Sequence, residues 1–320
     1  MCLRTLTNPE ILRQCHPVVF GSVKLLQRVS AAIGLPWPDQ IAVRESACPG
    51  NFDGPAIVDC PMETAALVVP GRISIACGAA AYAAIETAIE AASVGYLDAV
   101  ATAPIHKEAL RLAGITHPGH TEIFTALTHS KRTCMMLHSE VLTVSMVTTH
   151  IGYAEVPQRI TTQRILDVIE LTAEALTAMN GKPARLGICG LNPHAGEHGL
   201  FGQREEERFV EPAIKIARER GILIEGPLPP DAAFTTAQRK RYDGIVTLYH
   251  DQGHIPFKML AFEDGVNVTL GLPIIRTSVD HGTAFDIAWQ GVARPASLCQ
   301  AVACAIRLGA ARREKLSLPA

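Results

Sequence analysis

The chain has 320 residues, of which 48% are hydrophobic and 19% are charged, and its formal net charge is -2. Neither charge sign forms a long block, which argues against a protein that follows the phosphate backbone of a nucleic acid. No continuous apolar run reaches the roughly 18 to 20 residues that a membrane-spanning helix needs. These features predict a soluble globular protein, large enough for two lobes and suited to a small polar ligand.

Apolar runs rich in β-branched residues recur along the chain and predict buried strands. They lie at residues 17–22, 56–60, 97–104, 142–150, 185–194 and 242–250. Residues 79–95 and 161–179 lie between such runs and are long enough for helices that connect parallel strands. The sequence therefore predicts an α/β fold. No repeat or low-complexity linker marks a boundary, so consecutive and interleaved lobes both remain open.

The nine cysteines are odd in number and contain no CxxC pair. Cys77, Cys189 and Cys304 have apolar neighbours, which predicts reduced core thiols and a cytoplasmic protein. The first 22 residues have no continuous apolar segment followed by a small-residue cleavage site, so no signal peptide is expected.

Several predicted strands end in polar clusters, at the place where ligands bind in open α/β sheets. His150, His194 and His250 each follow such a strand. Neutral imidazoles are common ligands of divalent metals, and three protein ligands leave coordination positions for water or substrate. The alternative is that each is a surface histidine or a hydrogen-bonded core histidine, and the spacing alone leaves both interpretations open.

Two further segments carry side chains suited to a polar ligand. "GHTE", residues 119–122, fits either a ligand-binding loop or a turn that caps a helix. Lys258, Asn267 and Arg276 supply cations and an amide suited to a carboxylate or phosphate, although isolated surface cations are the commoner explanation of such residues. The chain contains no G-x-G-x-x-G fingerprint, P-loop, H-E-x-x-H site or G-x-S-x-G elbow.

Eight ordered motifs together resemble the 4-hydroxythreonine-4-phosphate dehydrogenase family. They are "TAPIHKEALRLAG", "PGHTE", "VTTHIGYAEVP", "LNPHAGEHGLFGQREEE", "GPLPPDAAF", "YHDQGHIPFK", "GVNVTLGLPIIRTSVDHGTAFDIA" and "GVARPAS". The resemblance implies an isocitrate/isopropylmalate-dehydrogenase-like fold with two interleaved lobes and a cleft between them. The lobes would be residues 1–125 plus 285–320, and residues 126–284, the second carrying the metal histidines and dimer contacts.

The resemblance also implies NAD-dependent, metal-assisted oxidation of a C3 hydroxyl in a 4-phosphorylated four-carbon hydroxy acid, followed by decarboxylation. The enzyme would be a cytoplasmic homodimer with shared active sites, and its metal would be Zn, Co or Mg. The residues that match the family's site are the metal ligands His150, His194 and His250, the substrate contacts His120, Thr121, Lys258, Asn267 and Arg276, and the cofactor loop Asp280, His281, Gly282, Thr283 and Ala284.

The sequence departs from the family pattern in two places. The family opens with a strand and a Gly-rich loop of the form "MGDPxGIGPE", and this chain matches the family only after that loop, so a first strand is expected to be missing. "GHI" at residues 253–255 stands where the vitamin-pathway members more often have "GL", which favours the paralogues acting on 4-phospho-D-threonate. A non-catalytic metal-binding relative is the alternative, and a metal hydrolase would use the same histidines.

Overall fold

A computed structural model describes residues 1–45 and 50–317, and these residues form two compact units. The first unit contains residues 1–130 and 272–309. The second contains residues 131–271, together with the end of the last helix from Ala310. Residues 126–130 and 272–284 therefore group by contact with the first unit. The division into functional lobes at residues 125 and 284 remains a prediction.

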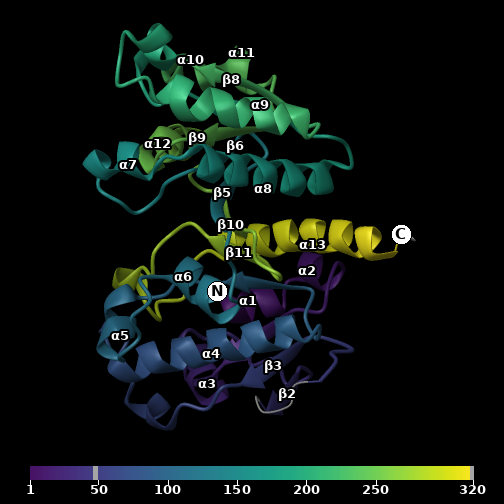
Figure 1. The fold of residues 1–320 in the computed structure, drawn as a ribbon. Coiled ribbons are helices and arrows are strands. Elements are labelled where there is room, and N and C mark those ends of the chain that lie inside the picture. The colour runs from purple at the N-terminus through teal and green to yellow at the C-terminus, as the bar shows by residue number, and fades with distance from the viewer. Residues whose placement is uncertain (46–49, 318–320) are drawn as a thin grey trace. The chain divides into compact units, whose positions relative to one another are not determined.

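The first unit is built from short parallel strands and the helices that cover them (Figure 1). β1, β3 and β2 form one parallel sheet, and β4 pairs in parallel with β11. The strands are β1 (Val18–Gly21), β2 (Ala42–Glu45), β3 (Ala56–Asp59), β4 (Ala99–Thr102) and β11 (Ile275–Val279). The helical elements are α1 (Cys2–Leu6), α2 (Pro9–Leu12), α3 (Val23–Ala32), η1 (Glu63–Leu67), α4 (Ile75–Ser93), α5 (Lys107–Leu112), α6 (His120–Leu127), η5 (Phe285–Ile287) and α13 (Ala296–Ser317).

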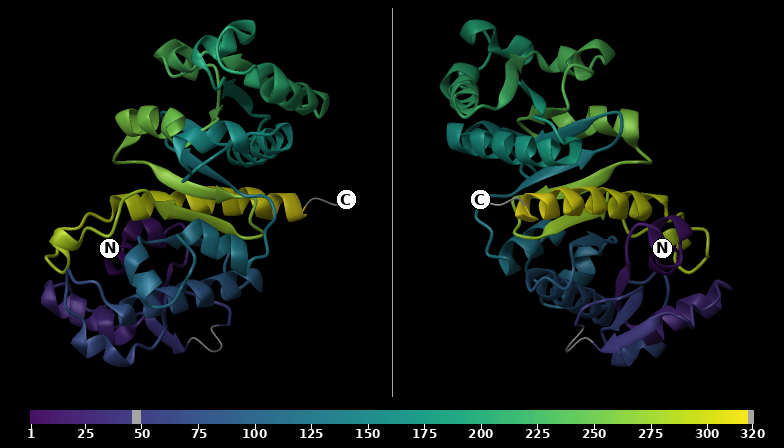
Figure 2. Two further views of the ribbon diagram at one scale, coloured as in Figure 1. Left: turned by 60° about the vertical axis from the view of Figure 1, so that its left-hand side comes forward. Right: turned by 90° about the vertical axis from the view of Figure 1, so that its right-hand side faces the viewer.

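Helix α4 is the main helix of the first unit, and it packs on β1 and β4. Its length and composition would also suit a membrane span, but this is weak evidence, because core helices of soluble proteins meet the same criterion. Helix α13 lies alongside β11 (Figure 2), and the Thr277 hydroxyl donates a hydrogen bond to the Ala301 carbonyl at 2.8 Å. These helices supply the apolar cover that a parallel sheet requires.

The second unit contains a mixed sheet in the order β10-β5-β6-β9-β7-β8. The strands are β5 (Cys134–His138), β6 (Thr143–Met146), β7 (Arg185–Cys189), β8 (Leu223–Leu228), β9 (Gly244–Thr247) and β10 (Val266–Leu270). The helical elements are η2 (Tyr153–Glu155), α7 (Val156–Arg159), α8 (Thr162–Asn180), η3 (Pro193–Gly199), η4 (Glu206–Val210), α9 (Glu211–Glu219), α10 (Pro230–Ala233), α11 (Thr236–Arg239) and α12 (His250–Ala261). β5 runs antiparallel to both β6 and β10, a feature that the βαβ pattern does not predict.

Helices α8 and α12 cover opposite faces of this sheet. A side chain at Gly244 would meet Leu176 of α8, whereas a side chain at Gly253 of α12 would meet Thr247. Positions 244 and 247 are three apart on β9, so their side chains point to opposite faces. The Thr161 hydroxyl accepts a hydrogen bond from the Arg164 N–H and caps the start of α8. The sheet is therefore buried on both faces, and its strand ends remain available for a site.

The predicted α/β class is confirmed, and all six predicted strands are present. The eight cysteines within the described part of the chain are free thiols, among them the buried Cys189 and Cys304 and the partly exposed Cys77. Cys48 lies outside the described residues.

Candidate active site

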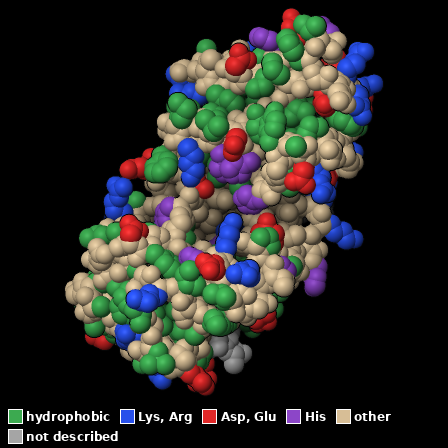
Figure 3. All heavy atoms as spheres, turned by 90° about the vertical axis from the view of Figure 1, so that its left-hand side faces the viewer, with side chains coloured by type: hydrophobic (Ala, Val, Ile, Leu, Met, Phe, Trp, Pro, Cys, Tyr) green, Lys and Arg blue, Asp and Glu red, His purple; other side chains and the backbone are tan. Residues whose placement is uncertain are grey.

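Three neighbouring parallel strands carry the predicted metal histidines into loops at one edge of the second unit's sheet. β6 pairs in parallel with β9, and β9 pairs in parallel with β7. His150 follows β6, His194 follows β7, and His250 is the first residue of α12 after β9. Because carboxyl ends of parallel strands meet at the same edge, the fold brings the three loops to one edge of this sheet. Figure 3 shows histidine side chains, in purple, at several places on one face of the molecule.

Hydrogen bonds tie the ends of these strands together. The Thr148 hydroxyl and backbone N–H both donate to the Leu248 carbonyl, at 2.8 and 3.2 Å. The buried Gln252 amide accepts from the Leu248 N–H at 2.7 Å and donates to the Gly190 carbonyl at 2.8 Å. One side chain of α12 thus links the end of β9 to the end of β7. Sequence reasoning missed Gln252, because nothing in its position marks it as buried.

The His250 ring is hydrogen-bonded to the side chain of the next residue, Asp251. Its Nδ1 lies 2.6 Å from Asp251 Oδ1, and a neutral ring that donates this hydrogen bond keeps its lone pair on Nε2. The His150 and His250 ring centroids are 5.9 Å apart. Both rings therefore offer nitrogen donors that suit a divalent cation, and the distance between the rings allows both to face one ion. Asp251 is a second residue that sequence reasoning missed, although it lies in the "YHDQGHIPFK" motif.

His194 lies in a left-handed turn that two buried glutamates hold in place. Residues 194–198 all have positive φ, from 42° to 79°. Glu206 is 1% exposed, and its Oε1 accepts from the Leu191 and Asn192 N–H groups, each at 2.8 Å. The Asn192 amide also donates to Glu205 Oε2 at 2.9 Å. Non-glycine residues resist this conformation, and the carboxylates fix Leu191 and Asn192, the residues that lead into it.

The three histidines do not form a complete metal site within one chain. Residues 1–45 and 50–317 contain no group of three or more His, Cys, Asp or Glu side chains placed to hold one ion. The histidines share an edge of the sheet, and two of their rings approach each other. Their joint role as ligands remains a prediction.

Replacing Glu206 by glutamine is expected to loosen the His194 turn. One of the two carboxylate oxygens becomes an NH2 group, and a buried donor then faces the donors of residues 191 and 192. We expect a loss of roughly 1 to 3 kcal/mol in the free energy of unfolding, measured with urea. The exposed Glu211→Gln is the matched control. Equal unfolding midpoints for the two variants would contradict the role assigned to Glu206.

The first unit holds a buried cation beside the start of α6. Arg276 is 2% exposed and its Nη2 donates to Thr102 Oγ1 at 2.9 Å. Its guanidinium lies 5.6 Å from the Phe124 ring centroid, and burial lowers the pKa of Arg276 to about 10, which leaves it charged at neutral pH. His120 and Thr121 begin α6, where the first backbone N–H groups lack helical partners. A buried cation and a helix start together suit an anion such as phosphate.

His120 is held neutral in this environment. Burial lowers the pKa of His120 to about 3, and the nearby Arg276 charge acts in the same direction. A neutral imidazole donates one hydrogen bond and adds no charge to the subsite.

The neutral His120 predicts an acid-sensitive fold. Its folded pKa of about 3 lies below the unfolded value of 6.5, so between these values the unfolded chain holds a proton that the folded chain lacks. Stability is therefore complete above pH 6.5 and falls as the pH is lowered towards 3. We expect His120→Gln to have a smaller drop in melting temperature between pH 6.5 and 4.5 than the original chain, as measured by calorimetry. Parallel curves would contradict this account.

Lys258 and Asn267 belong to the second unit. Lys258 lies two turns after His250 on α12, and its Nζ is 5.4 Å from the Phe262 ring centroid. Asn267 lies in β10 opposite Leu137 of β5. Its side-chain Oδ1 is buried and makes no hydrogen bond within the described residues. A buried amide oxygen without a partner costs free energy, as expected where a ligand supplies the donor.

The predicted cofactor loop, residues 280–284, follows β11 and leads into η5. The stretch "SVDHGTAFDIA" suggests a turn that enters a helix, but only a single 3-10 turn forms, and Ala284 has a φ of 46°. His281 Nδ1 forms a hydrogen bond with the Gly282 carbonyl at 2.9 Å. A side chain placed at Gly282 would have no other atom within 4 Å. The loop is thus open to a ligand, and its role as the NAD site remains a prediction.

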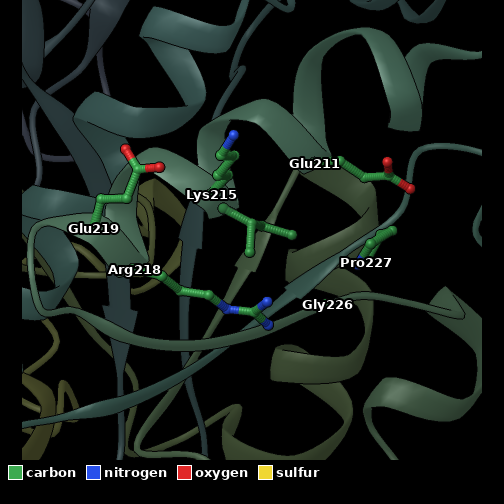
Figure 4. Close-up of a pocket in the computed structure, with 7 residues that line it drawn as sticks. Glu211, Lys215, Arg218, Glu219, Gly226 and Pro227 are labelled. Atoms are coloured by element: carbon green, nitrogen blue, oxygen red, sulfur yellow. The ribbon is translucent and has the colours of Figure 1, made fainter.

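A separate open hollow lies between α9 and β8 of the second unit (Figure 4). It is lined by Glu211, Ile214, Lys215, Arg218, Glu219, Gly226 and Pro227. The two acids and two bases balance in charge, and none of the predicted site residues lies there. The strand-end histidines remain the better candidate.

The fold is an α/β fold of the isocitrate/isopropylmalate-dehydrogenase-like type, and the named relatives define the class as an oxidoreductase. The family model described as "Pyridoxal phosphate biosynthetic protein PdxA" matches residues 13–305. The chain therefore belongs to the PdxA family, which confirms the predicted family and fold.

Known relatives cover nearly the whole chain. A 4-hydroxythreonine-4-phosphate dehydrogenase of Desulforapulum autotrophicum is 43% identical over 302 residues, covering 93% of this chain and 87% of the relative. A D-threonate 4-phosphate dehydrogenase of Salmonella typhimurium is 42% identical over 295 residues, covering 91% and 89%. The crystal structure of 4-hydroxythreonine-4-phosphate dehydrogenase from Klebsiella pneumoniae has a TM-score of 0.80 and 40% identity, covering 91% of this chain and 88% of that one.

Proposed function

We propose that the protein oxidises the C3 hydroxyl of a 4-phosphorylated four-carbon hydroxy acid with NAD and a divalent metal. The observation that carries the proposal is the set of three histidine loops at the carboxyl ends of adjacent parallel strands, with His250 Nδ1 bonded to Asp251. The dehydrogenase relatives, similar over about nine tenths of both chains, support turnover rather than a non-catalytic binding role.

The proposed roles follow from the chemistry of each side chain. His150, His194 and His250 would hold a divalent metal, which when bound lowers the pKa of the substrate hydroxyl and stabilises developing negative charge. Arg276 neutralises an anionic end of the substrate, and His120 donates a neutral hydrogen bond to it. Lys258 supplies a second cation, Asn267 accepts a hydrogen bond from the substrate, and Thr121 offers a hydroxyl at the start of α6.

The proposed reaction needs NAD as its only oxidant. The C3 carbon gives a hydride to NAD and the hydroxyl gives a proton to solvent, which leaves a ketone. The product is a β-keto acid, and its ketone accepts the electron pair of the breaking C1–C2 bond as carbon dioxide leaves. The enolate that forms then takes a proton from solvent at C2. The residues of the loop at 280–284 would contact the cofactor.

The substrate is proposed from two groups of relatives. Relatives bear the names of both the hydroxythreonine and the D-threonate enzymes. "GHI" at residues 253–255 favours 4-phospho-D-threonate over 4-phosphohydroxy-threonine. The test is reduced-nicotinamide absorbance at 340 nm with each acid and with Zn²⁺, Co²⁺ or Mg²⁺. Turnover with 4-phospho-D-threonate is expected, and absence of turnover with both acids and every metal would refute the proposal.

We further propose a cytoplasmic homodimer whose active sites draw on both copies. The three histidines of one chain do not complete a metal site, which supports a second copy that supplies a further ligand. The apolar outer face of α12 also supports a second copy. Ile255, Met259 and Phe262 recur there at helical spacing and are 58%, 81% and 74% exposed. The free cysteines of the described residues favour the cytoplasm.

Placing a charge on this face of α12 is expected to weaken the dimer. Met259→Glu should lower the mass measured by light scattering towards that of one 34.3 kDa chain. Val43→Glu, at an exposed apolar residue of the first unit, is the matched control. A wild-type chain that is monomeric, or two variants with equal masses, would count against the proposed interface.

A further inference from the structure

We propose that His254 is a positioning residue that holds the imidazole of His250 in the orientation that binds a divalent metal. This inference rests on the proposed metal site and adds a residue outside the predicted set of ligands. His254 lies one turn after His250 on α12, where residues four apart are neighbours.

The two rings are stacked face to face. Their centroids are 3.7 Å apart and their planes differ by 9°. The terminal χ2 torsion of histidine is broad, so the ring plane of an exposed histidine is poorly fixed by its own rotamer. The His250 side chain is 38% exposed, and His254 covers one face of its ring. The stack therefore restrains a torsion that the backbone leaves free.

The stacked geometry distinguishes His254 from a fourth ligand. A metal ion lies about 2.0 to 2.1 Å from an imidazole nitrogen, near the plane of that ring. Two nearly parallel planes at this separation cannot both contain the same ion. In this arrangement His250 can bind an ion along its Nε2 direction, while His254 supports the ring from the side.

Hydrogen bonds fix both rings of the stack. Asp251 Oδ1 accepts a hydrogen bond from His250 Nδ1 at 2.6 Å, so Nε2 is the ring nitrogen that remains to face a metal. His254 Nδ1 lies 3.3 Å from the His250 carbonyl, which can only accept, so this nitrogen is the donor. The His254 ring is thus anchored to the backbone of the residue that it supports.

Two substitutions separate ring stacking from other effects of His254. His254→Phe keeps a flat ring, whereas His254→Leu keeps an apolar side chain without one. The measurement is Co²⁺ affinity and the visible absorption of bound Co²⁺ in each purified chain. We expect about tenfold weaker binding and an altered spectrum for His254→Leu, and binding within about twofold of wild type for His254→Phe. Circular dichroism confirms the folding of each variant.

Two further variants complete the experiment. His16→Leu removes a histidine of the first unit and should bind Co²⁺ as the wild type does, while His250→Ala should lose most of its affinity. Unchanged Co²⁺ affinity and spectrum in His254→Leu would overturn the inference. The proposed metal site itself would still stand if His250→Ala fails to bind Co²⁺. Equal losses in His254→Phe and His254→Leu would also overturn it, because the ring face would not be the cause. Full binding by His250→Ala would remove the metal site and this inference together.

Discussion

Replacing His194 by alanine is expected to reduce metal affinity on the order of 100-fold or more and turnover to below about one hundredth. The reason is the loss of one of three proposed ligands, since the remaining two imidazoles cannot saturate a divalent cation. The fold should survive because the residue lies in a loop outside the sheet. Metal content by mass spectrometry and NAD reduction are the measurements.

His198→Ala is the matched control for His194→Ala. Both residues lie in the same left-handed turn, with φ of 53° for His194 and 56° for His198, so the backbone cost of the substitution is the same. Only His194 belongs to the proposed ligand set. Full metal stoichiometry in His194→Ala, or equal losses in the two variants, would show that His194 is not a ligand.

Replacing Arg276 by methionine is expected to weaken binding of the phosphorylated substrate without destabilising the fold. A buried guanidinium pays a desolvation penalty, and an apolar side chain of similar length avoids it. The melting temperature should therefore stay level or rise. KM should increase by about 10- to 100-fold, the value of one or two charge-assisted hydrogen bonds. Calorimetry and steady-state kinetics measure the two effects.

Arg276→Lys tests whether the shape of the cation matters as well as its charge. Lysine keeps the charge but loses the planar fork that bonds two oxygens at once, so KM should again rise. The exposed Arg132→Lys preserves its ion pairs with Asp167 and Glu170 and is the control. An unchanged KM in both Arg276 variants would remove this residue from the substrate site.

The sequence was sufficient for the α/β class, the six strands and the family, for physical reasons visible in local patterns. Buried parallel strands are continuous β-branched runs, and polar residues directly after them mark the edge where ligands bind. The position of His150, His194 and His250 after strands was predicted in this way, and their role as metal ligands stays a prediction. Five strands were missed, because Met-rich β5 and the exposed β2 lack that pattern and β8 contains Pro227.

Tertiary structure alone decided which polar side chains are buried and what they contact. Nothing local in "REEE" shows that Glu206 is buried against residues 191 and 192, and nothing near Arg276 shows its contact with Thr102, 174 positions away. The antiparallel placement of β5 between β6 and β10 likewise depends on pairing over a long separation. Sequence patterns report the periodicity of one element, whereas the burial and pKa of a side chain depend on elements that pack against it. Residue types at strand ends were therefore predictable, and the contacts that hold them required the fold.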